Sequence, residues 1–291
     1  MDLISIIICC RDVDIPNDLK ENIKNTIGAG YELIIIDNSD NRHSIFSAYN
    51  EGLGRASGNI LCYMHEDVVY HSKNWGKNVL EYFGDYPQVA MLGVAGTHFL
   101  PKRPAAWWDT EMQSGHLLQG ELVANAYRRR EDMWQDYKCC PTKVVCVDGL
   151  WMCFRHEIFD YIRWDDTTFK GFHGYDTDIC LQVWRAGFEV HVCWNILIEH
   201  KSTGVANEVF YKELDVLYEK WKDMLPVIKG VELSKSEQVA RERIVELRHE
   251  IYNSNLALSR ITKSREYRWG QYLFNPAEGL KSVLSHIRKK L

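Results

Sequence analysis

The sequence predicts a mixed α/β fold, in which a mainly parallel sheet is flanked by helices and followed by a helical C-terminal extension. Short apolar runs rich in isoleucine occupy Leu3–Cys9, Leu33–Ile36 and Ile60–Met64, and each ends at polar residues. Such runs are typical of parallel strands that are buried on both faces. Segments with helical spacing separate them, so the chain opens with a βαβ unit. From about Glu208 onward the pattern is helical and charged.

The first half of the chain alternates between these strands and helices. Helical spacing over Ile15–Ile27 ends at Gly28, a plausible residue to follow a helix C-terminus. A second helix is predicted over Ser44–Ala56, and Gly58 then marks the turn into the third strand. Val89–Val94 has the composition of a further strand.

The second half is less regular. Thr97–Cys140 shows little periodicity, and we expect a loop-rich insertion. Val144–Phe154 has a strand pattern broken by an Asp-Gly pair, Asp178–Ala186 has a helical pattern, and Glu189–Ile198 resembles a last strand. The sheet is therefore expected to end near His200.

These patterns divide the chain into two predicted parts. Residues 1–205 form the α/β domain, whose halves are 1–95 and 96–205, and residues 206–291 form the helical extension. In the extension, the amphipathic stretch Gln238–Ile261 could pair with a second copy of the chain. Leu280–Leu291 combines an apolar stripe with basic residues, and it fits either a helix on an anionic membrane surface or one packed on the domain.

Composition narrows the functional classes. The net charge of -5 and pI near 6.1 argue against a general nucleic-acid binder, which normally carries a basic surplus. No signal-like segment opens the sequence, so we expect a cytoplasmic protein, with peripheral contact to the membrane if the last helix binds lipid. Nine cysteines, two pairs of them adjacent in sequence, suit neither a disulfide framework nor zinc spacing, and we expect reduced thiols.

Carboxylates gather at predicted strand ends and in loops. Taken singly, an Asp after a strand is more often a turn or cap residue. Together with a histidine, separated carboxylates also suit a hard divalent cation, the usual partner of a diphosphate. The residues concerned are Asp37 with Asp40, Glu66 with Asp67, Asp176 with Asp178, and His200.

Over roughly its first 200 residues the chain resembles glycosyltransferase family 2, whose members have the GT-A fold. Ile4–Arg11 and Leu33–Ser39 are similar to the family's first two strands. Ala48–Asp67, reading AYNEGLGRASGNILCYMHED, is similar to the block that ends in the family's DxD motif. Phe169–Gly187 resembles the acceptor-side segment, and Glu199–His200 resembles the strand-terminal histidine of the metal and diphosphate site.

The resemblance implies a donor site for a nucleotide-diphospho-sugar, most often a UDP-sugar, and a divalent cation, Mn²⁺ or Mg²⁺. Asp67 matches the second acid of DxD and would bind the metal with His200. Asp37 matches the residue that contacts the base. His65 replaces the usual first Asp of the motif, and it could contact the ribose, bind the metal or fill space. The residues assigned to the nucleotide sugar are Cys10, Arg11, Asp37, Asn50, Arg55, His65 and Glu66.

The implied reaction is an inverting displacement in which Asp176 takes the proton of an acceptor hydroxyl. The acceptor would be a glycan or another hydroxyl compound, and the expected role is in cell-surface polysaccharide or glycan synthesis. Tyr175 stands where the family usually has Glu. Aromatic rings stack on sugars but more often form core, and structural packing is favoured for Trp151. The residues considered for the acceptor are Trp107, Trp108, Trp151 and Tyr175.

Two other functions remain open from the sequence. A nucleotidyltransferase also uses an α/β sheet and carboxylate-bound metal, but it normally has a glycine-rich loop after the first strand, and here that strand runs into Cys10–Asp14 without glycine. A catalytically silent relative could bind a nucleotide sugar or glycan without transfer. The joint presence of Asp67, Asp176 and His200 favours the enzyme.

Overall fold

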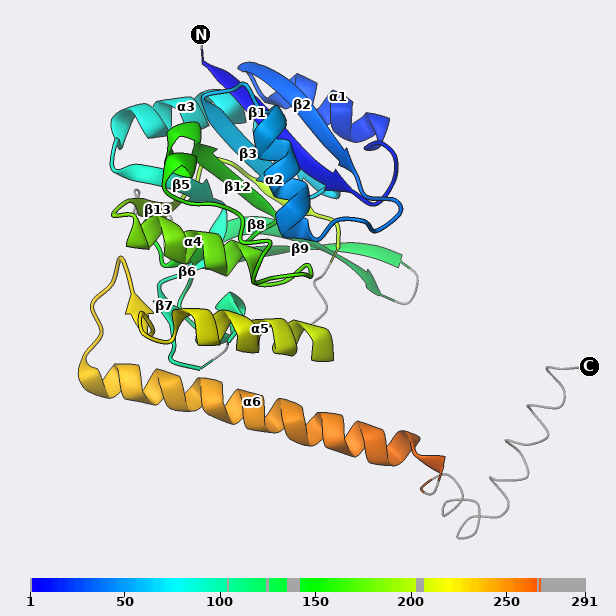
Figure 1. The fold of residues 1–291 in the computed structure, drawn as a ribbon, viewed down its shortest axis with the longest axis vertical. Helices are drawn as coiled ribbons and strands as arrows, with labels where there is room; N and C mark the ends of the chain where they lie inside the picture. The colour runs from blue at the N-terminus through cyan, green and yellow to red at the C-terminus, as the bar shows by residue number, and fades with distance from the viewer. Residues whose placement is uncertain are drawn as a thin grey trace, which may run out of the picture. The chain divides into compact units, whose positions relative to one another are not determined.

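A computed structural model of the chain describes residues 2–103, 105–123, 126–134, 142–202, 207–265 and 267, without the side chains of 121–123 and 126. The chain divides into two compact units, Met1–Glu242 and Arg243–Leu291. Figure 1 shows the helices and strands of the first unit and the long helix that leaves it.

The main sheet of the described residues has seven strands in the order β10-β13-β5-β12-β3-β1-β2. Strand β1 pairs in parallel with β2 and β3, and β13 pairs in parallel with β5. Strand β12 is antiparallel to both of its neighbours, β3 and β5, and β10 is antiparallel to β13. The strands span Leu3–Cys10 (β1), Gly30–Asp37 (β2), Ile60–Met64 (β3), Val89–Gly93 (β5), Thr142–Lys143 (β10), Trp151–Arg155 (β12) and Glu189–Val192 (β13).

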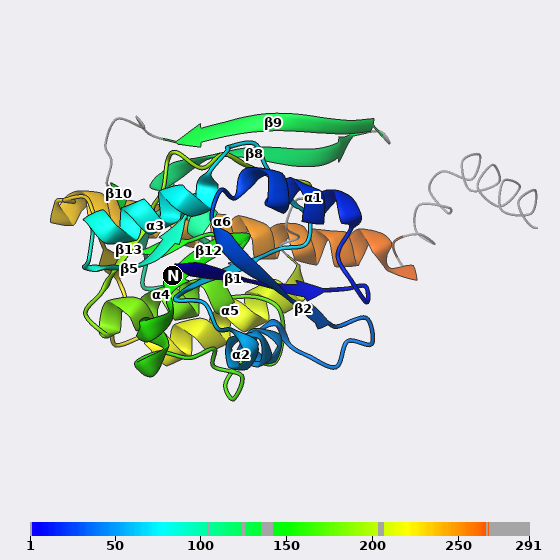
Figure 2. The same cartoon turned by 90° about the horizontal axis from the view of Figure 1, so that it is seen from above.

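Helices cover both faces of this sheet. Figure 2 shows α1 (Asn17–Thr26) and α3 (Trp75–Asp85) on one face, with α2 (Ile45–Arg55) and α4 (Tyr175–Arg185) on the other. Helix α2 begins where the sequence predicts, because the Ser44 side chain accepts a hydrogen bond from the Ser47 amide. The mixed α/β fold class predicted from the sequence is therefore confirmed.

A second sheet brings later segments to the carboxyl end of β3. Its order is β11-β6-β8-β14-β4, and β9 pairs with β8. These strands span Val68–Tyr70 (β4), Ala95–Thr97 (β6), Gln113–Val123 (β8), Ala126–Trp134 (β9), Cys146–Val147 (β11) and Ile198–His200 (β14). A small pair joins β7 (Phe99–Leu100) to β15 (Val227–Ile228). Two 3-10 turns, η1 (Trp107–Thr110) and η2 (His156–Asp160), also lie in the first unit.

The expectation of a loop-rich insertion at 97–140 is wrong for much of its length. Strands β8 and β9 form a long antiparallel hairpin, with nine paired positions from Gly115↔Trp134 to Val123↔Ala126. The pattern hides the strands because glycines and polar residues interrupt β8 and because Arg128–Arg130 make β9 charged. The predicted last strand is likewise two strands, β13 and β14, which belong to different sheets.

Helix α5 (Glu208–Trp221) belongs to the same compact unit as the sheets, although the sequence assigns it to the extension. Its N-cap Asn207 accepts hydrogen bonds from the amides of Val209 and Phe210. The boundary between the two compact units lies at Glu242 and Arg243, whereas the sequence places the start of the extension at residue 206. The packing of α5 on the sheet domain is what the pattern does not reveal.

Helix α6 (Lys235–Lys263) is the long helix of the C-terminal region. A capping box begins it, because Ser234 and Glu237 exchange hydrogen bonds between side chain and amide. Among the described residues, no helix is long and apolar enough to cross a membrane. The basic stretch Leu280–Leu291, for which a membrane contact is one interpretation, lies outside those residues.

Candidate active site

A cavity of about 840 Å³ opens where the carboxyl end of β3, the second sheet, the start of α4 and helix α5 meet. It contains nine of the residues singled out from the sequence, so the structure brings most of the predicted site together. These are Arg11, His65, Glu66, Asp67, Trp107, Trp108, Tyr175, Asp176 and His200.

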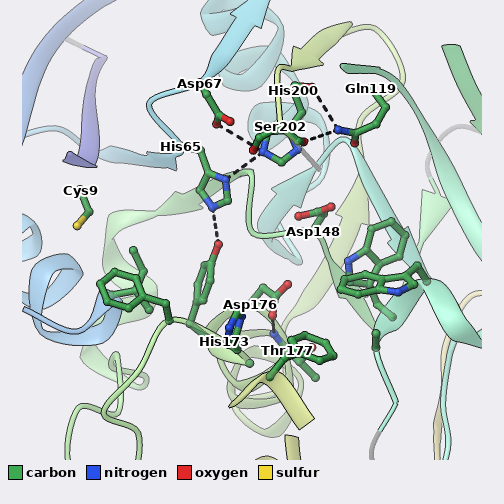
Figure 3. Close-up of a pocket in the computed structure, with 18 of the residues that line it drawn as sticks. Cys9, His65, Asp67, Gln119, Asp148, His173, Asp176, Thr177, His200 and Ser202 are labelled. Atoms are coloured by element: carbon green, nitrogen blue, oxygen red, sulfur yellow. Dashed lines mark hydrogen bonds and ion pairs between the residues drawn. The ribbon is translucent and has the colours of Figure 1, made fainter. Parts of the chain in front are cut away.

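One end of the cavity holds His65, Asp67 and His200. The first two follow β3, and the pairing of β14 with β4 sets His200 opposite Val68, next to Asp67. His200 Nε2 lies 3.4 Å from Asp67 Oδ1 and 3.4 Å from His65 Nδ1. The three side chains each offer one ligand atom within 4.8 Å of the others. Figure 3 shows the three side chains turned toward one another.

The protonation of this cluster suits a cation. Burial, followed by the nearby His200, lowers the pKa of His65 to about 4, so its imidazole is neutral at pH 7. Burial alone would raise the pKa of Asp67, but the hydrogen bond and charge of His200 hold it below its usual range. Burial would lower the pKa of His200, yet Asp67 raises it. The cluster therefore contains an ionised carboxylate and at least one neutral imidazole.

Tyr175 orients His65. The tyrosine hydroxyl lies 2.7 Å from His65 Nε2, which directs the opposite nitrogen, Nδ1, toward His200 and Asp67. When Nε2 carries the proton and donates to Tyr175, the Nδ1 lone pair is free to bind a cation. Tyr175 thus acts on the histidine that replaces the usual aspartate.

Asp176 lies in the first turn of α4 and faces the cavity, as Figure 3 shows. Its Oδ1 accepts a hydrogen bond of 2.7 Å from the Thr177 amide. Burial, followed by the charge of Asp148, raises the pKa of Asp176 to about 7. A carboxylate whose pKa is close to neutral pH is well matched to accept a proton from a hydroxyl.

Asp178 turns away from the cavity and anchors the start of α4. Its carboxylate lies 2.6 Å from Lys220 Nζ and accepts hydrogen bonds from Trp221 Nε1 at 2.7 Å and from Gln182 Nε2 at 2.8 Å. Lys220 also pairs with Asp165 at 2.7 Å. This buried network connects α5 to the turn that carries Asp176, so Asp178 supports the start of α4.

The Glu66 carboxylate is hydrogen-bonded to residues at the end of β1. It accepts hydrogen bonds from Cys10 Sγ at 2.8 Å, from the Arg11 amide at 3.1 Å and from Arg11 Nε at 2.8 Å. Glu66 therefore holds two strand ends together, while the rest of the Arg11 guanidinium stays exposed at the cavity. Cys10 itself is buried and does not line the cavity.

Besides Cys10, four residues predicted for the site lie elsewhere. Asp37 ends β2 and accepts from the Ser39 amide, and Arg55 donates to the Ile35 carbonyl at 3.2 Å. Asn50 donates to the Trp164 carbonyl at 2.8 Å, which makes it a link within the fold. The fourth is Trp151.

Trp151 is fully buried and outside the cavity, which corrects its assignment to the acceptor site. Its indole nitrogen donates to the Tyr70 hydroxyl at 2.9 Å. The ring packs edge-on against Trp75 with centroids 6.1 Å apart. Its strand, β12, lies in the middle of the main sheet, so the packing role that the sequence favoured is the one observed.

The sequence did not single out several residues that line the cavity. Asp148 is half-buried and acts on the charge of Asp176, and the only signal for it was the Asp-Gly break between two strands. Gln119 donates to the His200 carbonyl at 3.2 Å and also to that of Ser202, and it comes from a strand that the sequence did not predict. Trp134 and Phe210 come from β9 and α5. All four depend on tertiary contacts that no local pattern encodes.

Residues 5–223 match the sequence profile of the glycosyltransferase like family. The chain belongs to this family. The mixed sheet and flanking helices are those expected for the family's GT-A fold.

One curated protein to which this chain is similar is the streptomycin biosynthesis protein StrF of Streptomyces griseus. The two sequences are 28% identical over 157 residues, which is 52% of this chain and 50% of StrF. The chain therefore spans about half the length of that relative.

Solved structures with a distant likeness include other transferases. GalNAc-T7, solved with UDP, GalNAc and Mn²⁺, is 10% identical, with 90% of this chain and 58% of that chain covered and a TM-score of 0.48. TarS from S. aureus, solved with UDP-GlcNAc, is 10% identical over 94% of this chain and 76% of that chain, with a TM-score of 0.46.

Proposed function

We propose that this chain is an inverting, metal-dependent glycosyltransferase that moves a sugar from a nucleotide-diphosphate donor to an acceptor hydroxyl. The observation that supports this most strongly is the placement of the His65–Asp67–His200 cluster and the half-buried Asp176 in one cavity. Family membership supports the class of reaction. The donor is proposed to be a UDP-sugar, and the biological role to be glycan or cell-surface polysaccharide synthesis.

His65, Asp67 and His200 are proposed to hold a divalent cation. The donor set fits, because an ionised carboxylate and two imidazoles converge within 4.8 Å. Two imidazole nitrogens favour Mn²⁺ over Mg²⁺, which prefers oxygen ligands. When bound, the cation would neutralise charge on the diphosphate of the donor and of the departing nucleotide.

Asp176 is the proposed general base. The acceptor oxygen forms a bond to the anomeric carbon while the bond from that carbon to the diphosphate breaks, and the hydroxyl proton passes to the Asp176 carboxylate. The nucleoside diphosphate leaves with the electron pair of the broken bond. Attack opposite to the leaving group inverts the anomeric configuration. The raised pKa of Asp176, about 7, keeps the carboxylate basic enough to accept that proton near neutral pH.

The proposal is tested by separating binding from turnover. In Asp176→Asn, nucleotide-dependent titration heat should be retained, while transfer falls by about 100-fold or more because one general base is lost. The acceptor in this assay would come from a panel of hydroxylated glycosides, with donor consumption as the readout. Unchanged turnover in Asp176→Asn would remove Asp176 from the mechanism. Nucleotide binding without any transfer by the wild type would instead favour a silent nucleotide-sugar binder.

A further inference from the structure

The end of the cavity opposite the histidine cluster is built from aromatic rings. Trp107 and Trp108 come from η1, Trp134 from β9 and Phe210 from α5. Trp107 meets Trp108 edge-on at 5.8 Å and Trp134 edge-on at 6.1 Å. Trp108 stacks on Phe210 with centroids 5.5 Å apart and an angle of 23° between the rings. Because 41% of Trp108 remains exposed, this end, the aromatic subsite, presents part of a large ring to the cavity.

Two oppositely charged side chains beside the aromatic subsite pair with each other. Arg130 and Asp132 both line the cavity, and their side chains form a two-point contact, with Nε to Oδ1 at 2.7 Å and Nη2 to Oδ2 at 2.8 Å. The positive charge of Arg130 is thus compensated by Asp132, and the pair still presents planar hydrogen-bonding groups. An anionic acceptor would have to compete with Asp132 for Arg130.

Helix α5 fixes one wall of the aromatic subsite. Phe210 is 7% exposed, and its ring contacts His173 edge-on at 5.2 Å, three residues before Asp176. The other end of α5 is held by the pairing of Lys220 with Asp178. The wall and the base are therefore parts of one packed assembly, which keeps a ligand on the rings at a fixed position relative to Asp176.

We propose that the aromatic subsite binds the acceptor as a neutral sugar ring, with α5 supplying one wall. The inference rests on the proposed function, since it takes the histidine cluster as the donor end of the cavity. The C–H face of a pyranose packs on an aromatic ring, while its hydroxyls can bond Arg130 and Asp132. A ring held there lies in the same cavity as Asp176. The specificity of this protein for its acceptor is thus set partly by a helix outside the predicted α/β domain.

The test is binding of small glycosides by saturation-transfer NMR and calorimetry, with UDP and Mn²⁺ present. The probes are the methyl pyranosides of glucose, galactose, mannose and N-acetylglucosamine, and the corresponding sugar 1-phosphates. At least one neutral pyranoside should bind, with saturation strongest on the C–H protons of one face. Phe210→Ala should weaken that binding about tenfold, because stacking and packing on Trp108 are lost. The control is Val209→Ala, at an exposed neighbouring position of α5, which should bind as the wild type does.

A second variant tests the charge argument and does not depend on removing a core ring. Asp132→Asn leaves Arg130 without its matched carboxylate, and it should increase the affinity for a sugar 1-phosphate at least threefold. Preference of the wild type for sugar phosphates, no binding of any neutral pyranoside, or unchanged binding in both Phe210→Ala and Asp132→Asn would overturn the proposal. UDP titration of the same samples keeps the two proposals apart. Glycoside binding without UDP binding would contradict the transferase proposal but not the sugar-binding subsite. UDP binding without glycoside binding would contradict the subsite but not the transferase proposal.

Discussion

At the residue scale, His65 is the residue that distinguishes the candidate cation site from the usual family motif. Its Nδ1 lies 3.4 Å from His200 Nε2, and its Nε2 contacts the Tyr175 hydroxyl, so an imidazole occupies the place where the family motif usually supplies a carboxylate. Nitrogen ligands shift the preference of a site from Mg²⁺ toward transition metals. The protein is therefore expected to depend on Mn²⁺ more strongly than on Mg²⁺.

Replacing His65 by Asp should reverse part of that preference. His65→Asp restores a second oxygen ligand, and the ratio of nucleotide affinity in Mn²⁺ to that in Mg²⁺ should fall several-fold. The measurement is calorimetric titration of UDP at saturating metal. The matched control is His71→Asn. His71 pairs with Glu199 and does not line the cavity. An identical metal ratio in wild type and His65→Asp would show that His65 is not a ligand.

Asp176 and Asp148 form a second residue-scale pair, and they lead to a pH prediction. The raised pKa of Asp176, about 7, means that activity requiring its ionised form should rise with pH up to about that value. Asp148 contributes to the raised pKa by like-charge repulsion, so Asp148→Asn should move the acidic limb of the profile of kcat/KM to lower pH. A limb that stays in place, or moves to higher pH, contradicts the pairing.

The same shift has a consequence for stability. Because the folded pKa of Asp176 is raised above its unfolded value, the folded chain binds more protons than the unfolded chain between about pH 4 and pH 7. The contribution of this group to the free energy of unfolding is therefore fully present at low pH and is lost as pH rises through 7. Asp176→Asn should remove this pH dependence and increase stability at pH 8.

Sequence reasoning found the cation cluster and Asp176, whereas most residues that it assigned to the nucleotide sugar lie outside the cavity. Asp67, Asp176 and His200 stand at the ends of predicted elements, and the carboxyl ends of neighbouring strands converge by topology. Asp148 could not be identified as a site residue from the sequence, because an Asp-Gly pair in a site and one in a simple turn have the same sequence pattern. Trp151 could not be assigned with certainty, because an indole in a strand packs in the core as readily as it stacks on a ligand.

At the scale of elements, the contact between α4 and α5 is the one on which the site most depends. Asp178, which is 1% exposed, receives Lys220 and Trp221 from α5 at the turn that carries Asp176. Removing one member of a buried ion pair leaves the other charge without compensation, which is costly. Helix α5 is thus expected to be needed for both folding and activity.

Lys220→Met tests this contact. It keeps the apolar stem and removes the charge, and it should lower the free energy of unfolding by about 3 kcal/mol, measured by urea titration. The control is Lys222→Met, whose partner Glu219 is on the surface, and it should change stability by less than about 0.5 kcal/mol. Equal effects of the two substitutions would show that the buried pair is no more important than the surface one.

The elements themselves could be predicted where burial imposes a pattern. The runs at β1 and β3 are apolar because helices cover both faces of the main sheet, and their predicted bounds agree with the structure to within one residue. Strands β8 and β9 could not be predicted in this way, since β9 pairs with a single strand among the described residues and carries three consecutive arginines. Hairpin pairing stabilises them without an apolar repeat.

At the scale of the whole molecule, the described cavity lies where two sheets and a helix from distant parts of the sequence meet. The main sheet supplies His65 and Asp67, the second sheet supplies His200 and Gln119, and α5 supplies Phe210. The histidine cluster and the aromatic subsite therefore come together only when the sheets and α5 fold together within the first unit. No single segment contains the site. The sequence therefore indicated individual site residues, but not how the fold brings them together in one cavity.

The most direct test of the central claim is calorimetric titration of the intact protein with UDP and GDP, each with Mn²⁺, with Mg²⁺ and with EDTA. We expect one nucleotide to bind in the presence of Mn²⁺, more weakly with Mg²⁺ and not with EDTA, and Asp67→Ala to abolish that binding while remaining folded. Binding that is equally strong with EDTA, or that survives in Asp67→Ala, would contradict the account of a metal-dependent donor site at His65, Asp67 and His200.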